Sequence, residues 1–142
     1  MRDDPTFQKW CDWLKVIEQE VSTLFAHHDI FGTTIEIVQN NQAIDKASPF
    51  WGYFIRTYAD AMVMGIRRQC KDRKDSISLA RLLREIAASP KLVQRSDFES
   101  LFREPDPLGI YTRLKQEAFD TYAKPGSPYI DSARVINLTM SH

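Results

Sequence analysis

The sequence has few of the residues that build disulfide frameworks, thiolate metal sites or phosphate-binding loops. It contains only two cysteines, Cys11 and Cys70, so neither a disulfide framework nor a cysteine metal site is expected. Its five glycines are scattered singly, which argues against P-loop and dinucleotide-binding proteins. The longest apolar run, Ala61 to Ile66, is too short to span a bilayer, and residues 1–5 lack the hydrophobic core of a signal peptide. We therefore expect a cytoplasmic, reduced protein with no cofactor, no metal and no membrane contact.

The chain has no net charge, but its charges are distributed unevenly. The balance of 19 basic and 19 acidic side chains excludes a histone-like polycation, and 43% hydrophobic residues exclude a disordered chain. Residues 1–45 carry eight acidic and three basic side chains, whereas residues 67–84 carry seven basic and two acidic ones. This asymmetry predicts either a polyanion partner or a basic surface that docks on the acidic segment of the same or another copy.

Two helix-start signals open two long helices. Asp4-Pro5 and Ser48-Pro49 each place a capping oxygen before a proline that has helical φ. After Asp4, apolar residues recur at steps of three and four, which predicts a helix of about 22–24 residues. A break is expected at Asp29 to Gly32, followed by a short helix to about residue 40. After Ser48, a wide apolar face predicts a central helix to about Asp72, in which Gly65 indicates a close helix crossing.

The second half of the chain predicts shorter helices. Ser78 is expected to cap a helix that Ser89-Pro90 ends. Ser96 and Glu99 have the spacing of a capping box, which predicts a short helix containing Leu101 and Phe102. Two further helices are expected after Asp106-Pro107 and after Asp131, separated by a loop over residues 124–128. The sequence therefore predicts an all-α fold, a single helical domain over residues 1–142 with five to seven bundled helices, of which two are long and amphipathic.

Templates for metal binding and catalysis yield no assignable site. Adjacent helix residues point about 100° apart, so His27 and His28 do not suit one metal ion. We interpret His28 as packed and His27 as solvated near a helix C-terminus. Cys11 and Cys70 are interpreted as small buried hydrophobes or idle thiols rather than nucleophiles. Five aromatic residues are assigned to the core rather than to a base-stacking platform: Trp10, Phe50, Trp51, Phe54 and Tyr58. Trp13 is the exception, because it lies off the apolar stripe.

The most informative polar residues are Arg67, Arg68 and Asp72, at the end of the predicted central helix. Arg68 and Asp72 are four residues apart and can pair along a helix. A partly buried Arg68 would need a carboxylate or a phosphate for its guanidinium donors. We expect a carboxylate within hydrogen-bonding distance of Arg68, from Asp72 or from an acid of the first helix. A phosphate-binding arginine is the alternative.

The stretch from Phe50 to Pro90 carries a family resemblance. A long helix ends in Arg67-Arg68 and Asp72, and a short polar link leads to a leucine-rich helix that closes at Pro90. This pattern resembles helical proteins of bacterial abortive infection in the HEPN superfamily (higher eukaryotes and prokaryotes nucleotide-binding). The resemblance implies a helical bundle, often dimeric, in a phage-defence or toxin–antitoxin system. It also implies that the chain ends before a C-terminal helix that its relatives retain.

Active members of that superfamily are metal-independent ribonucleases with a closely spaced arginine and histidine on a late helix. Arg134 and His142 are too far apart for that pattern, so no catalytic residue is assignable. We expect a HEPN-like module that binds a partner protein, a second copy or RNA. A ribonuclease with a divergent or dimer-completed active site is one alternative, and a plain helical protein-interaction domain is another. The expected binding residues are those of the basic segment: Arg67, Arg68, Lys71, Asp72, Arg73, Lys74, Arg81 and Arg84.

Overall fold

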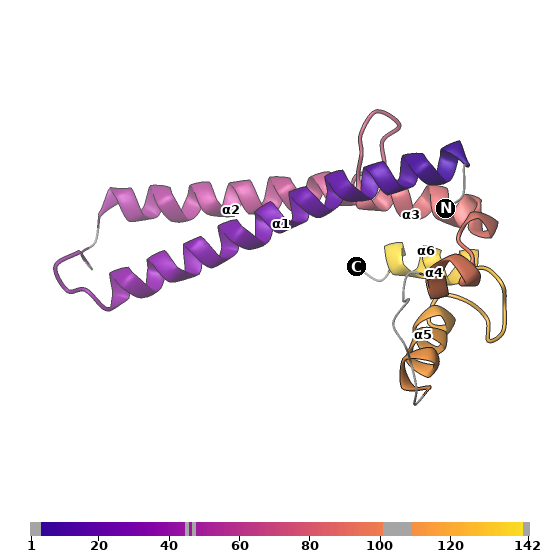
Figure 1. Ribbon diagram of the computed structural model, residues 1–142. Helices are drawn as coiled ribbons and strands as arrows, with labels where there is room; N and C mark the ends of the chain where they lie inside the picture. The colour runs from indigo at the N-terminus through magenta and orange to yellow at the C-terminus, as the bar shows by residue number, and fades with distance from the viewer. Residues whose placement is uncertain (1–3, 45, 47, 101–108, 141–142) are drawn as a thin grey trace. The chain divides into compact units, whose positions relative to one another are not determined.

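A computed structural model of the chain describes residues 4–44, 46, 48–100 and 109–140, in which helices are connected by turns and loops and no strand is present (Figure 1). The all-α fold with two long amphipathic helices, α1 and α2, is thus confirmed, and none of the described helices is both long and apolar enough to cross a membrane. The helices are α1 (Pro5–Gln39), α2 (Pro49–Cys70), α3 (Leu79–Ala88), the 3₁₀ helix η1 (Pro90–Leu92), α4 (Arg95–Ser100), α5 (Ile110–Asp120) and α6 (Ser132–Met140).

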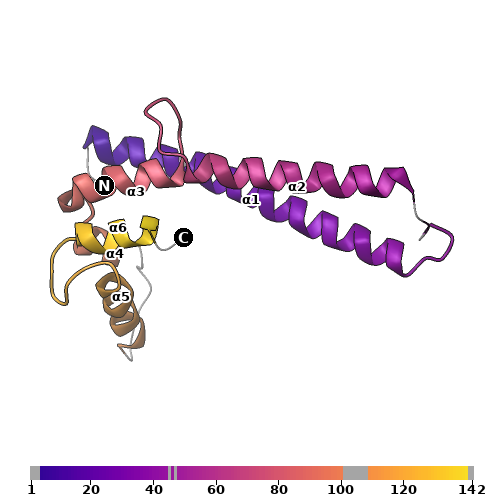
Figure 2. The ribbon, with the colours of Figure 1, turned by 180° about the vertical axis from the view of Figure 1, so that it is seen from behind.

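The chain divides into two compact units, and each is described by itself. Unit 1 comprises Met1–Cys11 and Ala80–His142, and unit 2 comprises Asp12–Leu79. Unit 2 is a helical hairpin in which α1 and α2 run side by side in opposite directions, as the views from both sides show (Figures 1 and 2). The expectation of a single domain over residues 1–142 stays a prediction.

Helix α1 is one continuous helix of 35 residues, so the predicted break at Asp29 to Gly32 is wrong. The helix begins where predicted, because Oδ1 of Asp4 accepts hydrogen bonds from two backbone N–H groups of the first turn. A glycine inside a helix costs only about 1 kcal/mol relative to alanine. Packing on both sides of Gly32 outweighs that cost: Phe31 before it stacks on Tyr58 of α2, and Val38 after it is buried.

Helix α2 begins as predicted and ends two residues earlier than Asp72. The Oγ of Ser48 accepts a hydrogen bond from the backbone N–H of Phe50 at 3.2 Å, and the next residue is Pro49. The predicted close crossing at Gly65 is confirmed. A Cβ at this position would lie 3.2 Å from both Cγ and Cδ1 of Leu24 and would overlap its Cδ2. The Leu24 side chain of α1 therefore packs against α2 at a position where α2 has no side chain.

Unit 1 has its own small core. Buried residues of α3, α5, α6 and the loop before α6 pack together, with Leu83, Ile86, Val93 and Phe98 against them. An arginine on α4 closes this unit: Arg95 pairs with Asp120, donates from Nε to the Ser127 carbonyl at 2.9 Å, and lies over the Phe119 ring. The buried core residues are Ala87, Phe119, Ala123, Ile130 and Val135.

The boundaries of the shorter helices follow the sequence signals in part. Helix α3 ends before Ser89-Pro90, and Oδ1 of Asp131 accepts a hydrogen bond from the Ala133 N–H at the start of α6, as predicted. Helix α4 begins at Arg95, so Ser96 lies inside the helix and its assignment as the cap is wrong. The backbone N–H of Phe98 donates to the Gln94 carbonyl, which sets the earlier start. The expected start at residues 106–107, and Leu101 and Phe102, lie outside the described residues.

Candidate functional site

The hairpin of α1 and α2 exposes many large apolar side chains. Two helices can bury only the stripe along which they touch, and few large apolar residues of α1 within the hairpin are fully buried: Ile17 and Val38. Further apolar residues lie on both sides of that stripe, where no described residue covers them. Their exposure is high for side chains of this size. The exposed apolar residues of the two helices in unit 2 are Leu14, Val16, Phe25, Ile30, Ile37, Phe50, Tyr53, Ile55, Val63, Met64 and Ile66.

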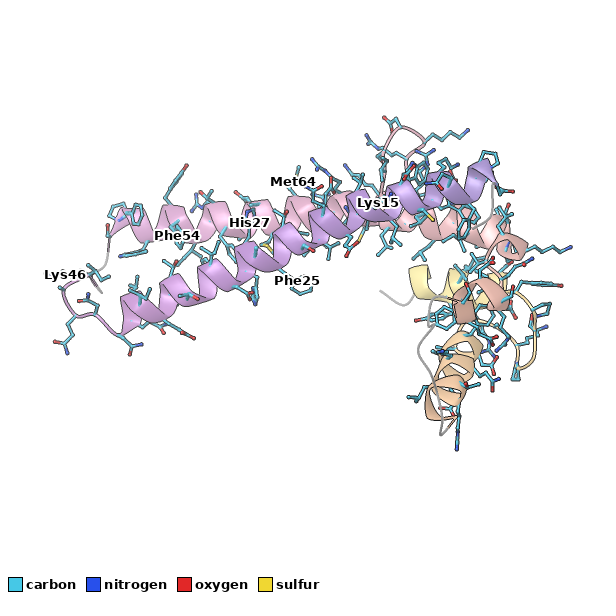
Figure 3. All side chains as sticks on the ribbon, viewed as in Figure 1. Lys15, Phe25, His27, Lys46, Phe54 and Met64 are labelled. Carbon is cyan, nitrogen blue, oxygen red and sulfur yellow. The ribbon has the colours of Figure 1, made fainter. Side chains whose placement is uncertain are left out.

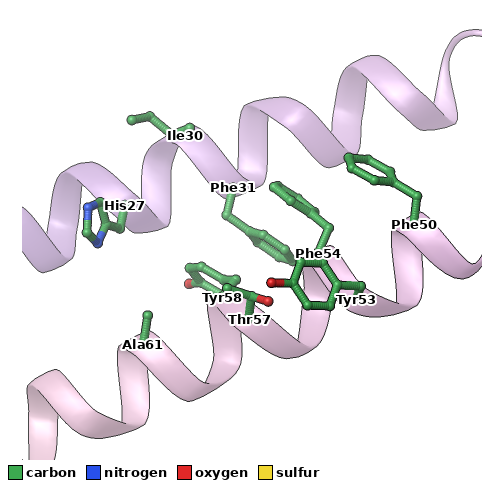
Figure 4. Close-up of a pocket in the computed structure, with 9 residues that line it drawn as sticks. All are labelled: His27, Ile30, Phe31, Phe50, Tyr53, Phe54, Thr57, Tyr58 and Ala61. Carbon is green, nitrogen blue, oxygen red and sulfur yellow. The ribbon is translucent and has the colours of Figure 1, made fainter.

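One side of the hairpin carries a groove of about 270 Å³ lined by aromatic rings, here called the aromatic groove. The rings of Phe31 and Tyr58 stack with centroids 3.8 Å apart, and Phe54 stacks on Phe31 at 5.6 Å. Phe50 continues the series at 6.2 Å from Phe54. Figure 4 shows these rings between the two helices, with Ile30 at the rim. The lining residues are His27, Ile30, Phe31, Phe50, Tyr53, Phe54, Thr57, Tyr58 and Ala61.

A second groove, of about 330 Å³, lies toward the C-terminal end of α2 and is mainly aliphatic. Phe25 is 66% exposed and points away from both helices (Figure 3). At about 100° per residue, Phe25 and Ile30 lie on different sides of α1, and so do Tyr53 and Ile66 of α2. The hairpin therefore has apolar grooves on two sides. The lining residues of the second are Val21, Leu24, Phe25, His28, Met62, Ile66, Gln69 and Cys70.

A polar cluster fixes the end of the hairpin opposite the α1–α2 loop. Glu20 accepts hydrogen bonds from Nη1 of Arg68 at 3.0 Å and from Nε2 of Gln69 at 2.6 Å. The Oε1 of the buried Gln69 accepts the backbone N–H of Leu79 at 3.1 Å, while Ser78 donates to the Lys71 carbonyl. The prediction that Arg68 has a carboxylate within hydrogen-bonding distance, from Asp72 or from an acid of the first helix, is confirmed by Glu20. The arginine itself is largely exposed, so this ion pair is worth little by itself.

The expected binding residues belong to two different units. In unit 2, all of the predicted residues are exposed: Arg67, Arg68, Lys71, Asp72, Arg73 and Lys74. Arg81 and Arg84 belong to unit 1, where Nε of Arg81 lies 3.5 Å from Oε1 of Glu85. The structure thus brings Arg68 to Glu20 and Arg81 to Glu85.

Glu85 of α3 connects three side chains of unit 1. Its Oε2 accepts hydrogen bonds from Nζ of Lys9 at 2.6 Å and from the Trp10 indole N–H at 3.0 Å. Burial is the largest single influence on this carboxyl and raises its pKa. The hydrogen bonds from Lys9 and Trp10, together with the charges of Lys9 and Arg81, outweigh burial and leave the pKa of Glu85 below its usual value. These contacts hold the start of α1 on α3.

The structure confirms some of the other expectations and corrects others; His27 is solvated, as expected. His27 and His28 are both exposed and lie in the middle of α1, because that helix continues to Gln39. His28 is not packed; its Nδ1 lies 2.9 Å from the hydroxyl of Tyr58. Trp10 is buried as expected, whereas Phe50 is 59% exposed and is not a core residue.

The remaining candidates for catalysis or metal binding are the two cysteines, Arg134 and His142. Cys11 is partly buried and Cys70 is exposed. Within the described part of the chain, no group of three histidine, cysteine, aspartate or glutamate residues could hold a metal ion. The Nη1 of Arg134 donates to the backbone carbonyls of Asp120 and Thr121 at 2.6 and 3.3 Å, at the end of α5. His142 lies outside the described residues.

No family model, curated protein or solved structure matches the chain. Its function therefore has to be inferred from its own residues and their arrangement.

Proposed function

We propose that the chain is a helical module that works by assembling with a second copy of itself through the aromatic groove of the α1–α2 hairpin. The observation that carries this proposal is the exposure of Ile30, Tyr53 and Met64, at 63%, 71% and 65%, beside the half-buried aromatic rings. Isolated exposed hydrophobic residues are ordinary, but a contiguous apolar surface across two helices is typical of an interface.

The apolar area is close to what an interface between two proteins requires. Ile30, Ile37, Phe50, Tyr53 and Met64 are each exposed by about 60% or more. Taking ~150–250 Å² for a large side chain, they offer on the order of 600 Å² of apolar surface. The half-buried rings in the groove add to this area. A standard interface buries about 800 Å² on each partner, so one side of the hairpin is large enough for a second copy.

The charges of the two helices favour a second copy over a polyanion at this surface. Residues 12–39 carry five acidic side chains and one basic one, while α2 carries three basic and one acidic. A nucleic acid lying along both helices would be repelled by α1. A second copy can instead place acidic α1 against basic α2, so the hairpin is complementary to itself.

The test is the mass of the purified full chain across protein concentrations, by sedimentation or by light scattering after gel filtration. A dimer is expected for the natural sequence. Substituting Ile30→Ser and Tyr53→Ser should weaken dimerisation at least tenfold, because central apolar side chains dominate interface energies. Ile55→Ser, at another exposed apolar position on α2, is the matched control and should leave the dimer intact. A dimer with even a weak dissociation constant, on the order of 100 µM, is substantially populated at that protein concentration. A natural chain that stays monomeric at about 100 µM would therefore refute the proposal.

The resemblance of residues 50–90 to HEPN proteins leads us to place this assembly in a phage-defence or toxin–antitoxin setting. A cytoplasmic location is proposed from the sequence, which shows neither a signal-peptide core nor a disulfide framework. RNA binding is the second candidate function. The observation that favours it is the exposure of Arg67, Lys71, Arg73 and Lys74 within one eight-residue stretch. We do not extend the proposal to ribonuclease activity, because the guanidinium of Arg134 donates to two backbone carbonyls.

A further inference from the structure

The side of the hairpin that bears the aromatic groove changes character along its length. Near the α1–α2 loop this side is apolar, with Ile30 and Ile37 on α1 and Phe50 and Tyr53 on α2. At the opposite end, helical spacing places charged residues on the same side. These are Asp12 and Glu20 on α1 and Arg68 and Lys71 at the end of α2. The side therefore has an apolar loop end and a charged open end.

Contacts within the hairpin show which residues of the two helices lie at the same level. Phe31 stacks on Tyr58, Leu24 lies against Gly65, and Glu20 binds Arg68. Moving one residue forward along α1 thus corresponds to moving one residue backward along α2.

Two copies can pack face to face about a two-fold axis in two ways. With the axis parallel to the helices, α1 of each copy lies against α2 of the other, and the two loop ends lie together. With the axis across the helices, α1 lies against α1, and at full overlap the loop end of one copy covers the open end of the other. The second arrangement places the apolar ends on charged residues and brings acidic α1 against acidic α1.

We infer that the two copies pack about the axis parallel to the helices and form an antiparallel four-helix bundle, an inference that rests on the proposed self-assembly. Ile37 then lies at the level of the partner's Phe50 and Tyr53, so apolar surface covers apolar surface. At the open end, two Glu20–Arg68 pairs face each other with opposite charges adjacent. All four neighbouring helix pairs are antiparallel, as in up-and-down bundles, and the pair within each copy is joined by its own α1–α2 loop.

The distances between spin labels on the two copies test this arrangement. One label goes on the natural Cys70, at the open end, in a Cys11→Ser chain. The other goes on Gln42→Cys, in the α1–α2 loop, in a Cys11→Ser, Cys70→Ser chain. Neighbouring helices in a bundle lie 8–10 Å apart, so the two α2 helices, which are diagonal in this arrangement, lie about 14 Å apart. With the label arms added, both positions should give distances below about 30 Å between copies. Dilution with unlabelled protein should remove the dipolar signal, which shows that it arises between copies.

Each outcome decides between the proposals. Helix α2 spans about 33 Å at 1.5 Å per residue, so any dimer with the axis across the helices must separate one of the two label pairs by more than about 35 Å. A dimer with one such long distance would overturn this arrangement and leave the self-assembly in place. Absence of any dipolar signal together with a monomeric mass would overturn both. Two short distances with a dimeric mass support both.

Discussion

Replacing Gly65 by alanine brings two effects of opposite sign into competition. Alanine favours a helix interior over glycine by about 1 kcal/mol. The new Cβ, however, would overlap Cδ2 of Leu24 and lie 3.2 Å from its Cγ and Cδ1. Forcing extra atoms into a packed contact costs about 1–3 kcal/mol. Because Leu24 is only partly buried and its side chain can rotate, we expect the lower half of this range. Gly65→Ala should therefore lie between no change and about 1 kcal/mol of destabilisation.

Gly32→Ala is the matched control, since Gly32 also lies inside a long helix but has no heavy atom within 4 Å of a Cβ. The full gain of about 1 kcal/mol is expected there. The free energy of unfolding would be measured by urea titration with circular dichroism at one protein concentration, because the proposed dimerisation would make stability depend on concentration. The difference between the two variants should be about 1–2 kcal/mol. Equal stabilisation by both substitutions would refute the close approach of α1 and α2 at this point.

A double-mutant cycle separates the overlap from other effects of the substitution. In a Leu24→Ala chain, the side chain that obstructs Cβ is absent. Gly65→Ala should then stabilise the protein by about 1 kcal/mol, close to its effect at Gly32. If Gly65→Ala is equally destabilising with and without the Leu24 side chain, the cost has another origin and the assigned contact is wrong.

Further substitutions test unit 1 and the basic residues. The lowered pKa of Glu85 means that its ionised form stabilises the fold above pH 4.5 and that this contribution is lost as the pH falls through the folded-state pKa. Glu85→Gln should thus cost about 1–2 kcal/mol at pH 7 in urea titrations and much less at pH 3.5, whereas an equal loss at both values would contradict the shift. Asp131→Ala should cost about 1 kcal/mol by removing the α6 cap, and Asp131→Asn should cost little; equal losses would show that the cap bond is unimportant. If RNA binds the basic residues, Arg73→Ala with Lys74→Ala should lower the slope of log affinity against log salt by about two, measured by fluorescence anisotropy, and an unchanged slope would remove these residues from the contact.

Local signals in the sequence predicted most of the helix boundaries and one polar contact. Ser48-Pro49, Ser89-Pro90 and Asp131 act through atoms only a few residues away, so their effects can be read without knowing the fold. The carboxylate partner of Arg68 was also predictable as a class, because a guanidinium at the edge of a packed face needs an acceptor. Its identity, Glu20, depends on how α1 and α2 align.

Errors arose where distant packing outweighs a local preference. Glycine at position 32 and the polar residue Asp29 suggested a break, but the helix continues because Phe31 stacks on α2. The same error placed His28 near a helix end, although it lies in mid-helix beside Tyr58. Ser96 has a good capping sequence, yet α4 starts one residue before it. For α1 and His28, the deciding contact joins residues far apart in the sequence. For α4, it is the hydrogen bond from the Phe98 N–H to the Gln94 carbonyl, which starts the helix earlier.

The assignment of Phe50 to the core went wrong for a reason that bears on function. Apolar periodicity indicates only that burial of a helix face is favourable. It does not indicate whether the surface that buries this face belongs to the same molecule or to another. The wide apolar face of α2 exceeds what one neighbouring helix can cover, and the excess appears in the structure as the exposed rings of Phe50 and Tyr53. A face too wide for intramolecular burial is thus the sequence signal that points to the proposed contact surface. It follows that Phe50, the residue wrongly assigned to the core, is well suited to the proposed contact with a second copy.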